Sequence, residues 1–187
     1  MTRSTSIPSD WAVRCFGLSG QAGIAACRCA IAANPRDAAA WNNLGQKLFR
    51  LQRYTDALVA YDHALLIHPN YSLGLANRCG VLSQLGEYDQ ALASCDLALA
   101  GDGHWGVQGS ALAWDNRGDA LFNLKRYSEA LSSFERALHV NPNYFNAQRN
   151  RAIVLQQLEQ NSEQNPELRS SEVTTHQSTK LGKQSRK

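Results

Sequence analysis

A 34-residue period runs through the middle of the chain and constrains its fold more than any other feature. Residues 38–71 read AAAWNNLGQKLFRLQRYTDALVAYDHALLIHPNY, and residues 111–144 read ALAWDNRGDALFNLKRYSEALSSFERALHVNPNY. A weaker copy, SLGLANRCGVLSQLGEYDQALASCDLALAGDGHW, fills 72–105, and the start of a fourth copy covers 145–159. A unit of this length in tandem is typical of proteins that stack one small motif.

Each copy predicts two antiparallel helices. When the positions of a copy are numbered 1 to 34, apolar residues recur at helical spacing between positions 4 and 11 and again between positions 20 and 28. Small residues at positions 8 and 20 let the two backbones approach closely, and Pro69 and Pro142, both at position 32, stop the second helix. One helix pair cannot bury its apolar face alone, so we expect the copies to stack into a solenoid.

The residues at these positions resemble the tetratricopeptide repeat family, whose pattern is a Trp, Leu, Gly, Tyr, Ala, Phe, Ala and Pro series over 34 residues. The third copy carries it as Trp114, Gly118, Leu121, Tyr127, Ala130, Phe134, Ala137 and Pro142. The resemblance implies an all-α, right-handed superhelical solenoid of antiparallel helix pairs. It also implies a non-enzymatic interaction module that needs no cofactor.

The period divides the chain into seven segments. Residues 1–37 form a degenerate N-terminal repeat or cap, with a credible second helix at about 21–33 and a degraded first helix. Three repeats occupy 38–71, 72–105 and 111–144, and an insertion loop at 106–110 separates the last two. Residues 145–159 form a capping helix, and 160–187 are expected to be a disordered polar tail because they are polar and lack periodicity.

Composition excludes several classes of protein. The net charge of +3 is too small to indicate a nucleic-acid partner, and no apolar run is long enough to span a membrane. The five cysteines are odd in number and follow no framework of spacings, so we expect a reducing compartment, the cytoplasm, rather than a disulfide scaffold. Cys79 and Cys95 are expected to be packed thiols.

No motif for catalysis or metal binding is present in the sequence. The Gly-rich residues 101–106 lack the Lys-Ser/Thr ending of a phosphate loop and follow a helix rather than a strand. His63, His68 and His139 have no Cys or carboxylate partner at ligand spacing, so we expect surface histidines. The insertion at 106–110 predicts either a turn whose Trp105 packs on the next pair or a lip beside a binding groove.

Position 6 holds asparagine in all four copies, as Asn43, Asn77, Asn116 and Asn150. The resemblance places the first helix of each pair on the concave face of the stack, with this position pointing into the groove. An amide offers donors and an acceptor without charge, so these residues could grip the backbone of an extended peptide. Hydrogen bonding within the stack is an equal alternative.

Other groove positions add side chains that could select a ligand. They are Asn42, Gln46, Phe49, Asp115, Asp119, Phe122 and Arg149. Family members that bind acidic chaperone tails use a set of Lys, Arg and Asn side chains that hold a carboxylate. The corresponding positions here hold Asn42, Gln46, Asn77, Leu112 and Asn116, and only Asn77 matches. We therefore predict that the partner is not an acidic chaperone tail.

Position 7 departs from the family's usual leucine and predicts ion pairs between repeats. Arginine stands there in the later copies, and position 25 of the preceding copy is acidic each time. The predicted pairs are Asp62–Arg78, Asp96–Arg117 and Glu135–Arg151. A fixed repeat register is one role for such pairs; chance on a solvated face is the alternative.

The sequence thus favours a scaffold or adaptor that binds an extended protein segment in an Asn-lined groove. The alternative is a structural subunit that assembles or self-associates through its convex face or its open N-terminal end. The partner's identity does not follow from the sequence, because repeat arrays serve many systems.

Overall fold

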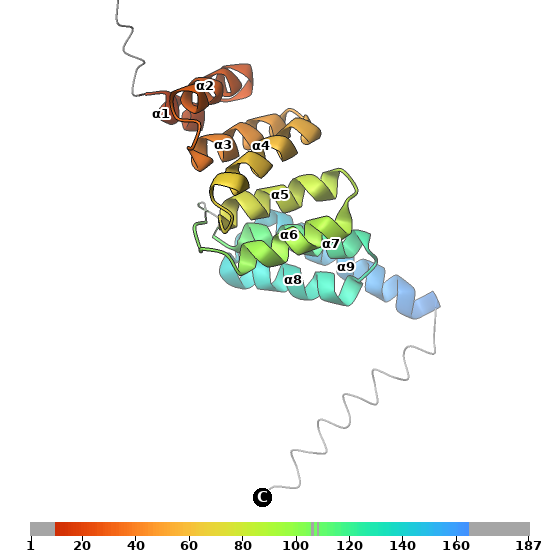
Figure 1. The fold of residues 1–187 in the computed structure, drawn as a ribbon. Coiled ribbons are helices and arrows are strands. Elements are labelled where there is room, and N and C mark those ends of the chain that lie inside the picture. The colour runs from red at the N-terminus through yellow and green to blue at the C-terminus, as the bar shows by residue number, and fades with distance from the viewer. Residues whose placement is uncertain (1–9, 106, 108, 165–187) are drawn as a thin grey trace, which may run out of the picture.

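The computed structural model describes residues 10–105, 107 and 109–164, and within those ranges the only regular secondary structure is helical. Successive antiparallel pairs stack from α1 and α2 at one end to α9 at the other (Figure 1). This is the all-α, right-handed solenoid that the repeats predict. The helices are α1 (Trp11–Gly17), α2 (Gly20–Ala33), α3 (Ala38–Arg50), α4 (Tyr54–Ile67), α5 (Ser72–Gln84), α6 (Tyr88–Leu99), α7 (Ala111–Asn123), α8 (Tyr127–Val140) and α9 (Phe145–Gln164).

The same turn joins the two helices of each full repeat. Position 15 has a positive φ in all three, at Gln52 (58°), Gly86 (82°) and Lys125 (61°). The next residue then donates its backbone N–H to a carbonyl near the end of the first helix, as Arg53 does to Leu48 at 3.0 Å. This bond satisfies a carbonyl that the helix end would otherwise leave unpaired, and it sends the chain back antiparallel.

The stack is curved because its two layers of helices pack unequally. The first helices of successive pairs touch one another, with α5 contacting both α3 and α7. The second helices of successive pairs, α2, α4, α6 and α8, make no such contacts among the described residues. The first helices therefore line the inner, concave face and the second helices the outer, convex face.

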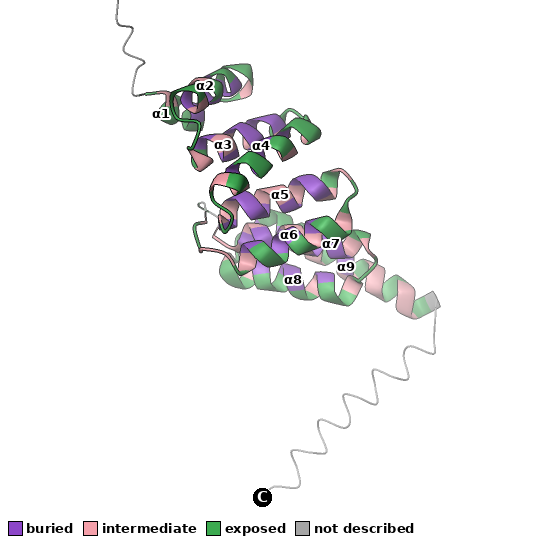
Figure 2. Cartoon of the chain, viewed as in Figure 1, coloured by how far each residue is buried: buried purple, intermediate pink, exposed green. Residues whose placement is uncertain are grey.

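Buried residues follow the faces between helices, as Figure 2 shows in purple. Ala57 and Ala130, at position 20 of their repeats, are fully buried where two backbones approach. Tyr61 and Phe134, at position 24, are the largest fully buried side chains. No helix in the described ranges is both long and apolar enough to cross a membrane.

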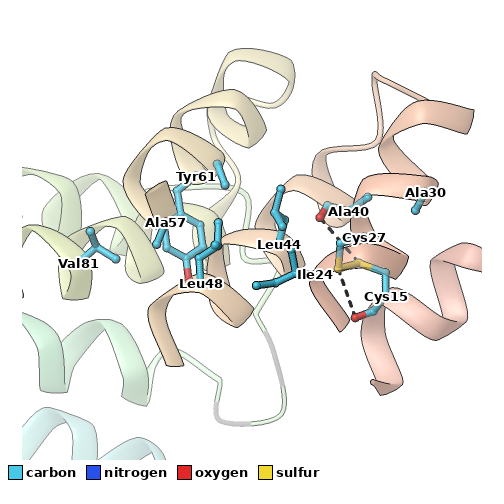
Figure 3. Packing of buried hydrophobic residues seen from close by; sticks show 11 residues of the cluster. Cys15, Ile24, Cys27, Ala30, Ala40, Leu44, Leu48, Ala57, Tyr61 and Val81 are labelled. Atoms are coloured by element: carbon cyan, nitrogen blue, oxygen red, sulfur yellow. Dashed lines mark hydrogen bonds between the residues drawn. A yellow bond between two sulfur atoms is a disulfide. The ribbon is translucent and has the colours of Figure 1, made fainter. Parts of the chain in front are cut away.

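The cysteine predictions are wrong for four of the five residues. Cys15 is joined to Cys27 and Cys79 to Cys95, so Cys79 and Cys95 are not packed thiols, while Cys29 is free and half-buried. Each disulfide ties the two helices of one pair together; Figure 3 shows Cys15–Cys27 at one end of a buried cluster that continues through Leu44 to Tyr61. Disulfides are typical of oxidising compartments, so cysteine usage gives no basis for a reducing cytoplasm.

At the two ends of the chain, one predicted boundary differs from the structure, the end of the capping helix. The first helix of the N-terminal pair is present as α1, although it is short, and residues 1–9 lie outside the described part. The capping helix α9 continues to Gln164, so the predicted polar tail does not begin at residue 160. Residues 165–187, the rest of the predicted disordered tail, lie outside the described residues.

Candidate functional site

A hollow of about 320 Å³ opens on the concave face near its N-terminal end. Asn42, Asn43, Gln46 and Arg50 of α3 form one wall, and Leu73 of α5 and Leu112 of α7 extend it. Phe16, Val107 and Gly109 complete the rim, so the α6–α7 insertion borders the hollow. Arg50 is the one charged residue on this lining, so the hollow is polar but nearly neutral.

The repeated asparagines hydrogen-bond across the junctions between repeats. Asn77 Nδ2 donates to Asn42 Oδ1 at 2.9 Å, and Asn116 Nδ2 donates to the Ala76 carbonyl at 2.9 Å. Asn150 Nδ2 donates to both Asp115 and Asp119, at 3.2 and 3.0 Å. Asn43, the first of the series, is half-buried in the wall of the hollow.

For Asn77 and Asn116, these bonds use only part of the hydrogen-bonding capacity of the amide. An asparagine has two N–H donors and an acceptor oxygen, and Asn77 and Asn116 each use one N–H within the stack. Asn42 differs because it is 2% exposed and accepts from Asn77, so it supports the groove from beneath.

Asp115 and Asp119 form an acidic pair toward the C-terminal end of the groove. Burial raises the pKa of Asp115 to about 7, with a further contribution from the neighbouring Asp119 charge. Burial likewise raises the pKa of Asp119 to about 6, against the opposing effect of Arg149. Because the neutral acids are favoured, this part of the groove carries less negative charge at neutral pH than two free aspartates would.

The two aromatic residues predicted for the groove, Phe49 and Phe122, pack at the edge of the hydrophobic core. Phe49 packs on Tyr54 and Phe122 on Tyr127, each with ring centroids 5.4 Å apart. The tyrosines begin α4 and α8, so each pair closes the turn end of a repeat. Both phenylalanines are half-buried.

The three inter-repeat ion pairs are formed, on the side of the stack away from the hollow. Arg78 Nε lies 2.7 Å from Asp62, Arg117 Nε lies 2.7 Å from Asp96, and Arg151 Nε lies 3.5 Å from Glu135. Arg117 also donates to Ser133 Oγ at 2.8 Å, so it links three helices. The half-buried arginines and exposed carboxylates place these pairs at the rim of each junction.

Two polar contacts were not apparent from the sequence. Asp102, in the connection between α6 and α7, lies 3.0 Å from His68 Nε2 and 3.1 Å from His104 Nδ1, and it accepts the Ser72 backbone N–H. This cluster fixes the α6–α7 connection to the α4–α5 turn, while Trp105 packs beside a buried cluster around Leu75. Lys47 is buried and donates to the Phe16 carbonyl at 3.0 Å, which anchors α1. Among the described residues, no group of His, Cys, Asp and Glu is arranged to hold a metal.

Two segments of the chain, 38–71 and 111–144, match the family model described as tetratricopeptide repeat. The chain belongs to the tetratricopeptide repeat family. Both matched ranges have the same limits as the repeats defined above from the 34-residue period.

Known tetratricopeptide repeat proteins are similar to this chain in sequence and structure. The small glutamine-rich tetratricopeptide repeat-containing protein 2 of Mycosarcoma maydis is 29% identical over 121 residues, which are 65% of this chain but only 33% of that protein. The first such domain of human RPAP3 superposes with a TM-score of 0.61 at 26% identity, covering 70% of this chain and 98% of that one. The first repeat domain of Spaghetti (RPAP3), solved with the HSP90 peptide SRMEEVD, gives 0.58 at 27% identity, covering 66% and 94%.

Proposed function

We propose that this protein is a non-enzymatic interaction module that binds an extended segment of a partner protein in its concave groove. The observation that carries the proposal is the hollow of about 320 Å³, walled by the polar face of α3 and bordered by α5 and α7. The peptide-bound RPAP3 domain supports a peptide as the class of ligand, because a related repeat domain holds one.

The asparagines would contact the backbone of the bound segment. Hydrogen bonds to the preceding repeat fix the orientation of Asn77 and Asn116, so little side-chain entropy is lost when their remaining donor and acceptor meet a peptide. Contacts to the backbone do not depend on ligand sequence, so selection would come from Arg50 at one end of the groove and from Asp115, Asp119 and Arg149 at the other.

We further propose that the ligand is not an acidic chaperone tail. A carboxylate needs cationic donors, yet the relevant positions hold neutral side chains, including Leu112 and the buried Asn42. Arg50 is the one cationic residue on the lining of the hollow, and Lys47 instead donates to the Phe16 carbonyl. A peptide ending in EEVD should therefore bind far more weakly than a neutral extended peptide from a true partner.

Site-specific photo-crosslinking in the full chain tests the groove. A photoreactive amino acid replaces Asn43, which lines the hollow, or Ser132, on the opposite side of the stack. In an extract from the source organism, the Asn43 probe should capture a partner that the Ser132 probe does not, and Asn77→Ala with Asn116→Ala should reduce the capture. Equal capture by both probes, or no effect of the double change, would contradict the groove.

Assembly through the N-terminal end is a second candidate, because α1 exposes apolar side chains. Val13 is 67% and Phe16 75% exposed, on a helix whose packing partners among the described helices are α2 and α3. Burying such side chains against another copy would stabilise an oligomer. Sedimentation of the full chain should then show an oligomer that Phe16→Ser dissociates; a monomer at all concentrations contradicts this role.

A further inference from the structure

The convex side of the stack carries two clefts at equivalent places in the repeat pattern. One, of about 400 Å³, lies between α2, α3 and α4, and the other, of about 450 Å³, lies between α6, α7 and α8. Trp41 in the first corresponds to Trp114 in the second, since both occupy position 4. Both clefts also include position 7 of the first helix and position 25 of the preceding one.

The side chains at these matched positions give the two clefts opposite chemistry. In the second, Arg117 pairs with Asp96, donates to Ser133 and lies over the Trp114 ring, so the polar groups on the wall of the cleft are paired with one another. In the first, Leu44 stands at position 7, with Val59 and Ala60 at the positions of the two serines. The first cleft is therefore an apolar version of the second.

Arg28 stands at the edge of the apolar cleft, where every later junction has a carboxylate. It is exposed, and among the described residues it forms no ion pair. Arg53 and Asp56 also line the cleft, and they are paired with each other. A cation without its carboxylate beside an unfilled apolar surface is complementary to a ligand that brings both an acid and an apolar group.

The surface next to the cleft extends this apolar character. Val59 lines the cleft and is 56% exposed, and Leu66, seven residues later on the same face of α4, is 80% exposed. The Trp41 wall is held rigidly, because its indole donates to the Pro35 carbonyl at 3.0 Å and its ring stacks on His63 at 4.3 Å. A preformed wall reduces the entropy lost on binding.

We propose that this convex cleft is a second binding site, which takes an apolar side chain flanked by carboxylates on a partner protein. The apolar side chain would lie over Leu44 and Val59 beside Trp41. A carboxylate would pair with Arg28, as Asp62 pairs with Arg78 at the next junction. This site is independent of the concave groove, because the two use opposite faces of α3.

The tryptophan indoles allow a direct test by NMR on the full chain. The chain has four tryptophans, and Trp41 and Trp114 report on the two equivalent clefts. The probe is a blocked tripeptide with one leucine between two glutamates. We expect a saturable shift of the Trp41 indole signal with a dissociation constant of about 1 mM or tighter, while the Trp114 signal stays in place. No saturable shift, or equal shifts of both indoles, would overturn the proposal.

Two control probes separate the two parts of the recognition. Replacing both glutamates with lysines, or the leucine with serine, should each weaken binding by about fivefold or more, since each removes one of the two complementary features. Equal binding of the lysine probe would show that Arg28 has no role, and equal binding of the serine probe would show that the apolar surface has none; either result rejects the site.

A matched variant converts the apolar cleft into the polar kind. Arg28→Asp with Leu44→Arg reproduces the pairing of the next junction, so it should fold, and it should abolish the Trp41 shift. Arg28→Gln, a change at an exposed position, keeps the proposal testable if the double variant does not fold. It should weaken the glutamate probe about fivefold and leave Asn43 crosslinking unchanged; unaltered probe binding contradicts the proposal.

Discussion

The ring of Tyr61 occupies the space that a side chain on Gly45 would need, since a Cβ there would lie 2.6 Å from a ring carbon. Gly118 and Phe134 repeat this relationship at 2.5 Å. In the repeat between them, the same two positions hold Cys79 and Cys95, joined by a disulfide. Where the two helices of a repeat come closest, the contact is therefore either an aromatic ring packed on glycine or a disulfide bond.

Gly118→Ala should destabilise the protein by about 2 kcal/mol, because the buried Phe134 ring would have to move. An alanine in a helix normally gains about 1 kcal/mol over glycine, so the sign of the effect distinguishes the close contact from propensity. Urea unfolding measures it, with Gly17→Ala as the control because nothing lies within 4 Å of a Cβ there. Stabilisation by Gly118→Ala would disprove the contact.

Replacing Cys79 and Cys95 together with alanine should lower the free energy of unfolding by about 3 kcal/mol, as expected for a loop of this length. The sequence separation of the two residues is 16. Thermal unfolding measures the loss, and Cys29→Ser is the control because that thiol is free. Alkylation should label one of the five cysteines before reduction and all five after it. Five labels without reductant would contradict both disulfides.

Arg78→Glu should destabilise the stack by about 1–2 kcal/mol, whereas Arg53→Glu should cost about 0.5 kcal/mol or less. Both arginines have an acidic partner, but Asp62 lies across a repeat junction and Asp56 lies within the same helix end. Arg78 is also more deeply buried, at 27% exposed against 42%. Chemical denaturation compares the two variants, and equal losses would mean that the inter-repeat pairs do not hold the register.

Stability should fall as pH rises from 5 to 8. Burial raises the pKa of Asp115 to about 7 and that of Asp119 to about 6 in the folded state. A raised carboxyl pKa means that the folded state binds the proton more tightly than the unfolded state does. Protonation therefore stabilises the fold, and this contribution is lost as pH rises through those values. Asp115→Asn can still accept the Asn150 hydrogen bond, so it should stabilise the protein by about 2 kcal/mol at pH 8 and have little effect at pH 5.

Thermal unfolding at the two pH values measures this difference. Asp89→Asn, at an exposed position of α6, is the control and should change stability equally at both. A flat pH profile in the parent protein, or a variant whose gain does not grow with pH, would show that the two groove acids titrate as exposed carboxyls.

The fold follows from the sequence because the repeats reinforce one another. A single copy can depart from the family pattern, as Leu75 does at a position where the other full repeats hold tryptophan. The 34-residue period still predicts where the helices of each full repeat lie. The partners of the position-7 arginines could be predicted for the same reason. Wherever position 7 holds arginine, position 25 of the preceding copy holds a carboxylate.

Contacts that depart from the repeat pattern could not be predicted in this way. Cys79 and Cys95 form a disulfide because positions 8 and 24 face each other, but the other two full repeats hold glycine and an aromatic residue there and give no sign of this bond. Asp102 and His68 meet because the connection between α6 and α7 packs on the α4–α5 turn, and the residues of this connection differ from those that follow the second helix in the other repeats. The sequence does not decide the role of the repeated asparagines, because one amide side chain can hydrogen-bond either within the stack or to a ligand.

The absence of a charge pair at the α2–α3 junction makes the ends of the solenoid respond differently to ionic strength. Added salt weakens rim-exposed ion pairs, so it should loosen the three later junctions while leaving the first, apolar junction intact or strengthened. Which end frays first would then depend on the surrounding electrolyte rather than on the sequence alone.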